Sequence, residues 1–206
     1  MLLQCKEHKH DANAHMNSIE FDKLVERFES SERASWQKPD EVISVLELKK
    51  NMVVADLGAG TGYFSRRFAR ALTTGTLYAL DVDEQWLNLL KKDAKKSGLK
   101  NYQVKKVGYQ GEGIAQLQLD IFFLCNVYHH INERVAYFAK VKKSLRPDGR
   151  LVIVDFYKKE TPIGPPVKHK MSKEKVASEM QQAGFSLAKT HSILPYQYIL
   201  EFKSSQ

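Results

Sequence analysis

A glycine-rich stretch constrains this chain more than any other feature: Asp56-Leu57-Gly58-Ala59-Gly60-Thr61-Gly62. It follows a short apolar run, residues 52–56, that contains β-branched residues and predicts a buried strand. Glycine is needed where the backbone adopts positive φ or approaches a ligand closely. Three glycines at alternate positions therefore predict a turn made of backbone, with a ligand site beside it. A tight strand-to-helix turn without a ligand is the alternative.

Strands and helices alternate along the chain on both sides of this loop. Apolar and β-branched runs predict strands at residues 52–56, 76–80, 102–107, 120–125, 150–156, 186–193 and 197–202. Helical spacing predicts helices around residues 64–72, 84–98, 135–145 and 173–183, and Pro147-Asp148-Gly149 predicts a turn. Such alternation predicts a mostly parallel seven-stranded sheet covered on both faces, an α/β three-layer sandwich. The closing hairpin places one antiparallel strand near the edge.

The chain before this core divides into two parts. Residues 1–17 are polar and lack periodicity, which predicts a flexible N-terminal arm ahead of a single domain, residues 18–206. Within that domain, residues 18–50 carry two amphipathic helices, the second beginning near Pro39, and residues 51–206 form the core. We expect the two helices to act as a lid. Three histidines and Cys5 in the arm match no structural zinc pattern, so no metal is expected.

Composition excludes several classes of protein. No apolar run is long enough to span a bilayer and no apolar leader begins the chain, so we expect a cytoplasmic protein without a membrane partner. Two cysteines far apart in sequence, Cys5 and Cys125, argue against a disulfide. The 32 basic against 24 acidic residues give a net charge of +8, which favours acidic partners. The lysines are scattered over helix faces, so nucleic-acid binding is possible but not favoured.

A nicotinamide or flavin site is the main chemical rival for the glycine loop. Its fingerprint, G-x-G-x-x-G, is met by Gly58 and Gly60, but Tyr63 stands at the third glycine position and Gly62 comes one residue early. The spacing therefore fails for a dinucleotide. Asp81, at the end of the second strand, lies where an acid would hold ribose hydroxyls of either cofactor. Asp83 competes for that role, although it is better placed to cap the next helix.

Four ordered segments carry a family resemblance. Residues 53–63 resemble motif I of the class I S-adenosylmethionine-dependent methyltransferases, and residues 77–83 resemble their second motif. Residues 119–130 are similar to their fourth strand and its exit loop, and residues 145–151 to the approach to their fifth strand. The likeness runs from about residue 40 to the end and is strongest for the type 11 and quinone-biosynthesis group. It implies a Rossmann-like fold with S-adenosylmethionine as cofactor and S-adenosylhomocysteine as product.

The resemblance also implies which residues contact that cofactor: Asp56, Gly58, Ala59, Gly60, Gly62, Asp81, Val82 and Asn126. The glycine loop would face the methionine part, with Asp56 orienting its amine. Asp81 would bind the ribose, Val82 would lie against the adenine and Asn126 would stand beside the sulfonium. Many relatives have an aspartate after the third strand that reads the adenine amine. This chain has Val-Gly-Tyr-Gln at residues 107–110, so that contact is not implied.

A general base is needed only if the methyl acceptor is protonated. The sulfonium is already a strong electrophile, so alignment of the acceptor supplies much of the rate. Tyr128, His129 and His130 follow the fourth strand and are the candidate catalytic residues; either histidine is suited to take a proton. Alternatively they cap the next helix or line the pocket. Trp36 and Tyr63 belong either to the cavity or to the core.

Several acceptors are disfavoured by what the chain lacks. Residues 126–129 (Asn-Val-Tyr-His) do not match the N-P-P-Y motif of methyltransferases acting on adenine or glutamine amino groups. Two cysteines are too few for arsenic chemistry, and we expect Cys125 to be buried and inert. The expected function is therefore methyl transfer from S-adenosylmethionine to a small or medium-sized organic acceptor. The alternatives are an RNA or protein methyltransferase, and a cofactor-binding module without turnover.

Overall fold

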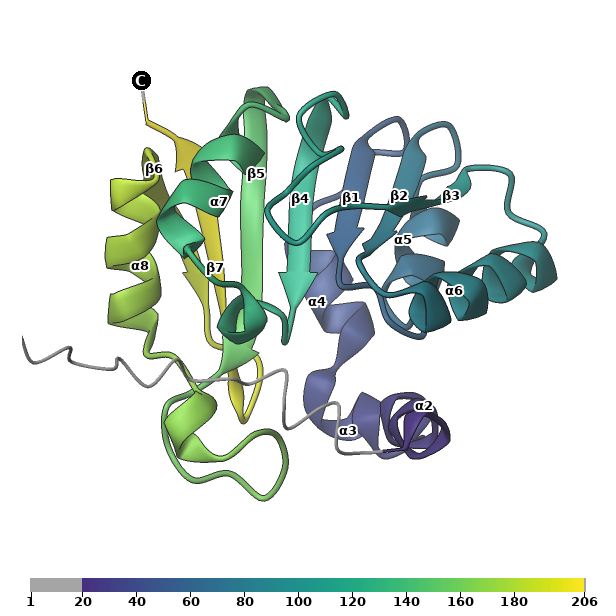
Figure 1. Cartoon of the computed structure of the whole chain (residues 1–206), viewed down its shortest axis with the longest axis horizontal. Helices are drawn as coiled ribbons and strands as arrows, with labels where there is room; N and C mark the ends of the chain where they lie inside the picture. Colours follow the sequence, from purple (N-terminus) through teal and green to yellow (C-terminus); the bar gives the residue numbers. More distant parts are fainter. Residues whose placement is uncertain (1–19, 206) are drawn as a thin grey trace, which may run out of the picture.

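A computed structural model describes residues 20–205 (Figure 1). Its strands are β1 (Val53–Leu57), β2 (Thr76–Asp81), β3 (Tyr102–Lys106), β4 (Leu119–Cys125), β5 (Leu145–Phe156), β6 (Phe185–His191) and β7 (Gln197–Ser204). Its α-helices are α2 (Phe21–Glu29), α3 (Arg33–Gln37), α4 (Pro39–Val45), α5 (Ser65–Ala71), α6 (Glu84–Ser97), α7 (Arg134–Lys142) and α8 (Lys173–Gln182). Two 3-10 turns, η1 (Tyr128–His130) and η2 (Val167–His169), complete the elements. The arm predicted for residues 1–17 lies outside the described residues.

All seven strands form one sheet in the order β3-β2-β1-β4-β5-β7-β6. β1 pairs in parallel with both β2 and β4, and the β2–β3 and β4–β5 pairs are also parallel. β7 runs antiparallel to β5 and to β6. This arrangement confirms the predicted seven-stranded sheet with a single antiparallel strand next to the edge. The strand order reverses between β1 and β4, and ligands bind at such a point in doubly wound sheets.

Helices cover both faces of the sheet, because side chains of successive strand residues point to opposite sides. On β1, Ala55 packs on the face covered by α7 and α8, whereas Val54 packs on the face covered by α4, α5 and α6. Phe68 of α5 meets Phe123 of β4 edge-on, with ring centroids 5.0 Å apart. The predicted three-layer arrangement is therefore present (Figure 1). A core of buried side chains lies on each side of the sheet.

The approach to β5 differs from the sequence prediction. The helix predicted to reach residue 145 ends at Lys142, and Leu145 already pairs with Leu119 of β4. The next β4–β5 pair is Ile121 with Arg150, so residues 146–149 form a bulge opposite Asp120 and not a turn before the strand. Proline and glycine are tolerated at such irregular positions. The Arg146 guanidinium lies 2.6 Å from the Asp120 carboxylate and fixes the bulge.

Among residues 20–205, three helices precede β1, where the sequence predicted two. α3 is the addition, and Lys38, with φ of 42°, separates it from α4. α4 begins at Pro39 as predicted. In Figure 1, α2, α3 and the segment around η2 lie beyond the ends toward which β1 and β4 point. Within residues 20–205, no helix combines the length and apolarity needed to cross a membrane.

Candidate functional site

A cavity of about 750 Å³ lies at the carboxyl ends of β1, β2, β4 and β5. The glycine loop and residues 81–83 form one part of its wall, and the β4 exit loop forms another. Side chains of α2 and α3 and the segment 163–169 close it from the far side. The cavity therefore occupies the switch point of the sheet, where the glycine loop predicted a ligand.

The glycine loop packs its backbone closely against its neighbours. Gly58 has φ of +63°, and a Cβ there would lie 2.4 Å from the Val127 side chain on the β4 exit loop. Gly60 has φ of +55°, and Ala59 donates its N–H to the Leu80 carbonyl at 3.1 Å. Gly58, Ala59 and Gly60 all line the cavity. Glycine is thus required at residue 58 for both conformation and space.

Asp81 turns its buried carboxylate toward the same loop. One oxygen accepts the Gly60 N–H at 3.1 Å, and the other accepts the N–H groups of Val82 and Asp83 at 2.8 and 3.2 Å. Burial raises the pKa of Asp81 above its ordinary value. Both Asp81 and Val82 line the cavity. Asp83 caps α6 as expected, accepting N–H groups from Gln85 and from the following residue.

Asp56 lies beneath the glycine loop and also lines the cavity. Its carboxylate accepts the Ser65 hydroxyl at 2.6 Å, and burial raises the pKa of Asp56 to about 7. Two neighbours in the cavity wall, Thr61 and Tyr63, have buried hydroxyl oxygens without a hydrogen-bond partner among residues 20–205. Buried polar atoms are normally hydrogen-bonded. Thr61 and Tyr63 therefore each have a polar atom that no described residue uses, and both lie in the cavity wall.

Hydrogen bonds between side-chain amides hold Asn126, the residue directly after β4, in place. Asn126 has φ of 61°, and its side-chain oxygen accepts a hydrogen bond from Gln197. The Gln197 oxygen in turn accepts the Gln37 side-chain N–H at 2.9 Å. Gln37 and Gln197 are completely buried. Asn126, which lines the cavity, is therefore positioned from α3 and from the start of β7 at once.

His129 forms a tight pair with Asp155 at the end of β5. The His129 Nδ1 lies 2.9 and 3.1 Å from the two Asp155 carboxylate oxygens, and the Phe156 N–H also donates to that carboxylate at 2.8 Å. The Asp155 side chain is fully buried. A carboxylate facing Nδ1 favours the tautomer with the proton on Nδ1, which leaves Nε2 as an acceptor. His129 and His130 both line the cavity, with ring centroids 4.2 Å apart.

Two of the predicted site residues do not reach the cavity. Tyr128 points into the core, where its ring stacks on Phe138 at 5.5 Å and its hydroxyl donates to Glu179. Gly62 packs against α6 and β3: a Cβ there would lie 2.5 Å from the Tyr102 hydroxyl. Tyr128 is thus corrected to a core residue, and the third glycine of the loop to a packing position. Turn η1 accounts for the position of Tyr128, because adjacent side chains of this 3-10 turn point in different directions.

The cavity wall also contains residues that sequence reasoning missed or left open. Trp36 and Tyr63 line it, as one of their two interpretations expected. Cys125, which the sequence predicted to be buried, is instead partly exposed and lines the cavity as well. Desolvation raises the pKa of its thiol. Asp155 was missed, despite standing at the carboxyl end of a predicted strand, a position that itself points to the site. No sequence signal marked Arg33 of α3.

Comparisons with known proteins agree with this geometry. The structure of an S-adenosylmethionine-dependent methyltransferase from Aquifex aeolicus matches with a TM-score of 0.83 at 24% identity, covering 89% of this chain and 98% of that one. A putative type 11 methyltransferase from Sulfolobus solfataricus matches with a TM-score of 0.65 at 25% identity, covering 82% and 92%. The fold is that of the class I, Rossmann-like methyltransferases.

Residues 48–203 match the family model of a methyltransferase domain, and the chain belongs to this family. A curated relative, a probable cobalt-precorrin-6B C(15)-methyltransferase (decarboxylating) from Pyrobaculum calidifontis, is 33% identical over 105 residues. The aligned region covers 50% of this chain and 54% of the relative, so the chain spans about half the length of that protein. The cofactor of this class is S-adenosylmethionine, as the glycine loop and its companion motifs predicted.

Proposed function

We propose that this chain transfers a methyl group from S-adenosylmethionine to a small organic acceptor. The observation that carries the proposal is that one cavity joins the glycine loop and Asp81 at one end to the His129–Asp155 pair at the other. A volume of about 750 Å³ lies within the range of small-molecule sites. The curated relative is named for a methylation of a precorrin, itself a small molecule.

The cofactor end of the cavity fits S-adenosylmethionine in the chemistry of its donors and acceptors. We infer that Asp81 holds the ribose, Val82 contacts the adenine, and Gly58, Ala59 and Gly60 face the methionine part beside Asp56. The unpartnered hydroxyls of Thr61 and Tyr63 supply further polar contacts there. When bound, the cofactor supplies an electrophilic methyl group. Asn126, fixed by Gln197, would line the position of the sulfonium.

The opposite end of the cavity has an aromatic and apolar wall. Trp36 of α3 and Phe156 of β5 lie with ring centroids 5.9 Å apart, and Ile163 and Pro165 of the following segment line the same space. Aromatic and apolar walls with few polar groups suit an organic molecule of modest size. We therefore favour a small or medium-sized acceptor over RNA or protein.

His129 is the residue best placed to accept a proton from that acceptor. Asp155 holds the ring through Nδ1 and would stabilise the imidazolium that forms, while Nε2 takes the proton. No hydrogen bond from Nε2 to another residue of the 20–205 range competes with this role. His130 lies beside it in the cavity wall and is the second candidate.

Calorimetry with S-adenosylhomocysteine, followed by product detection over a panel of acceptors, tests the proposal. We expect the wild-type chain to bind S-adenosylhomocysteine. When it is supplied with S-adenosylmethionine, it should methylate a small hydroxyl-, amine- or thiol-bearing acceptor and release S-adenosylhomocysteine. Absence of binding would overturn the cofactor site. Binding with turnover on RNA or protein only would overturn the acceptor class. Binding without turnover on any acceptor would identify a module that does not catalyse transfer.

A further inference from the structure

Arg33 presents a guanidinium to the cavity without an ion-pair partner among residues 20–205. Its Nε donates to the Gln37 side-chain oxygen at 2.5 Å and its Nη1 to the Phe28 carbonyl at 2.7 Å. Its Cζ lies 3.9 Å from the centroid of the Tyr63 ring. A guanidinium has five N–H donors. Those not used by Gln37 and Phe28 have no acceptor in the described part of the chain.

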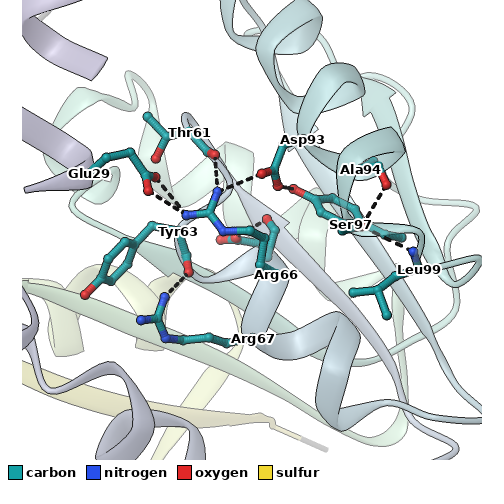
Figure 2. A network of polar contacts seen from close by, with 12 residues as sticks. Glu29, Thr61, Tyr63, Arg66, Arg67, Asp93, Ala94, Ser97 and Leu99 are labelled. Carbon is teal, nitrogen blue, oxygen red and sulfur yellow. Dashed lines mark hydrogen bonds and ion pairs between the residues drawn. The ribbon is translucent and has the colours of Figure 1, made fainter. Parts of the chain in front are cut away.

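Nearby acids are already engaged by other groups. Glu29 accepts two hydrogen bonds from Arg66, at 2.7 and 2.9 Å, and Figure 2 shows its carboxylate turned toward that guanidinium. Asp56 accepts the Ser65 hydroxyl. Arg67 stacks on the same Tyr63 ring at 4.3 Å but pairs with Asp40 at 3.3 Å. Of the three arginines around Tyr63, only Arg33 lacks a carboxylate partner among residues 20–205.

Partial burial makes the lack of a counter-charge beside Arg33 costly. Desolvation lowers the pKa of Arg33, yet an arginine stays charged in proteins. A buried charge without a counter-charge is unfavourable, so an anionic ligand that reached Arg33 would relieve that cost. The planar fork of a guanidinium matches the two oxygens of a carboxylate.

We propose that Arg33 binds the carboxylate of the methionine part of S-adenosylmethionine. The inference rests on the proposed function, because its ligand is the cofactor of that site. The amine and the carboxylate of methionine are attached to the same carbon, so their two receptors have to be neighbours. Asp56, assigned to the amine, feels the charge of Arg33, and Tyr63 under the guanidinium directly follows the glycine loop. An acidic group on the acceptor is the alternative ligand.

Two ligands that differ by one group test the assignment. S-adenosylhomocysteine and its decarboxylated form, in which hydrogen replaces the carboxylate, are titrated calorimetrically into wild type, Arg33→Gln and Arg33→Lys. Arg67→Gln is the matched control, because it removes the other guanidinium from the same Tyr63 ring. Near-ultraviolet circular dichroism and thermal unfolding establish that each variant is folded.

We expect Arg33→Gln to weaken S-adenosylhomocysteine binding about 10- to 100-fold, as for a lost charge-assisted hydrogen bond, and to leave the decarboxylated ligand unchanged. Arg33→Lys keeps the positive charge but lacks the planar guanidinium. Its affinity for S-adenosylhomocysteine should therefore lie between those of wild type and Arg33→Gln. Arg67→Gln should leave both affinities unchanged. Equal losses for the two ligands, or no loss with S-adenosylhomocysteine, would overturn the role of Arg33. Failure of wild type to bind either ligand would instead overturn the proposed cofactor site itself.

Discussion

Gly60 donates its backbone N–H to the Asp81 carboxylate at 3.1 Å, so the glycine loop and the acid after β2 form one hydrogen-bonded unit. Removing this carboxylate therefore disturbs both the proposed ribose contact and the conformation of the loop. We expect Asp81→Ala to weaken S-adenosylhomocysteine binding by roughly 10- to 100-fold, measured by calorimetry. Unchanged affinity would contradict the assignment.

Asp83 provides the matched control for that experiment. Its side chain caps α6, so Asp83→Ala should lower the free energy of unfolding by about 1 kcal/mol. Affinity for S-adenosylhomocysteine should change little. Urea denaturation and calorimetry on the two variants separate these roles, and the reverse pattern would exchange them.

The His129–Asp155 pair predicts a defined tautomer. Because the carboxylate accepts from Nδ1, wild-type His129 should carry its proton on Nδ1 at pH 8. Asp155→Asn presents an amide that can donate to Nδ1, and this moves the proton to Nε2. Two-bond and three-bond ¹H–¹⁵N correlation spectra of histidine-labelled protein report the change, and a wild-type spectrum with the Nε2 proton would disprove it.

The same pair predicts which histidine acts as the base. With a protic acceptor identified, His129→Gln should lower kcat by roughly 10²- to 10⁴-fold and leave S-adenosylhomocysteine affinity nearly unchanged. His130→Gln is the control and should have a much smaller effect. A larger loss in His130→Gln than in His129→Gln would transfer the role to His130.

Asp56 predicts a pH dependence of stability. Its pKa rises from an ordinary 3.8 to about 7 on folding, so the folded chain binds the extra proton between these values. The contribution to stability is full below pH 3.8 and is lost as the pH rises through 7. The loss corresponds to roughly 4 kcal/mol. Relative to wild type, Asp56→Asn should gain stability from pH 4 to 8 in urea denaturation; a constant difference would refute the shift.

Gly62 and Gly58 predict different consequences of the same substitution. Gly62→Ala places a Cβ 2.5 Å from the Tyr102 hydroxyl at φ of +83° and should cost roughly 1–3 kcal/mol of unfolding free energy. Because Gly62 lies outside the cavity, ligand affinity should persist in the folded fraction. Gly58→Ala pushes on Val127 in the cavity wall and should reduce both stability and affinity. Thermal unfolding with and without S-adenosylhomocysteine distinguishes the two cases.

Local sequence signals predicted the parts of the site that depend on local structure. The positive φ at Gly58 and Gly60, the Asp83 cap and the alternation of strands and helices are all determined within a few residues. The direction of the Tyr128 side chain was not predictable, because it depends on a single 3-10 turn and on Glu179 in α8. The bulge before Arg150 likewise depends on pairing with another strand.

Long-range contacts account for the residues that sequence reasoning missed. Asp155 meets His129 across 26 positions, and the contact requires β4 and β5 to be neighbours. The proposed role of Arg33 follows only from the tertiary structure, which places α3 over the cavity and Arg33 beside Tyr63. Neither the His129–Asp155 contact nor the position of Arg33 beside Tyr63 produces a periodic or compositional pattern in the sequence. Motifs therefore predicted the proposed cofactor end of the cavity, whereas the proposed acceptor end could be described only from the tertiary structure.

The amide chain from Gln37 through Gln197 to Asn126 also has an evolutionary consequence. Gln37 and Gln197 are fully buried, so replacing either one alone leaves a buried donor or acceptor of the other unpaired, at a cost of about 1–3 kcal/mol. Asn126 is partly exposed and accepts a hydrogen bond from Gln197. Substitutions at these positions are therefore tolerated in concert and selected against singly. Across homologous proteins, residues 37, 126 and 197 should therefore covary. Helix α3, which lies outside the sheet, and strand β7, next to its edge, would then change together in evolution.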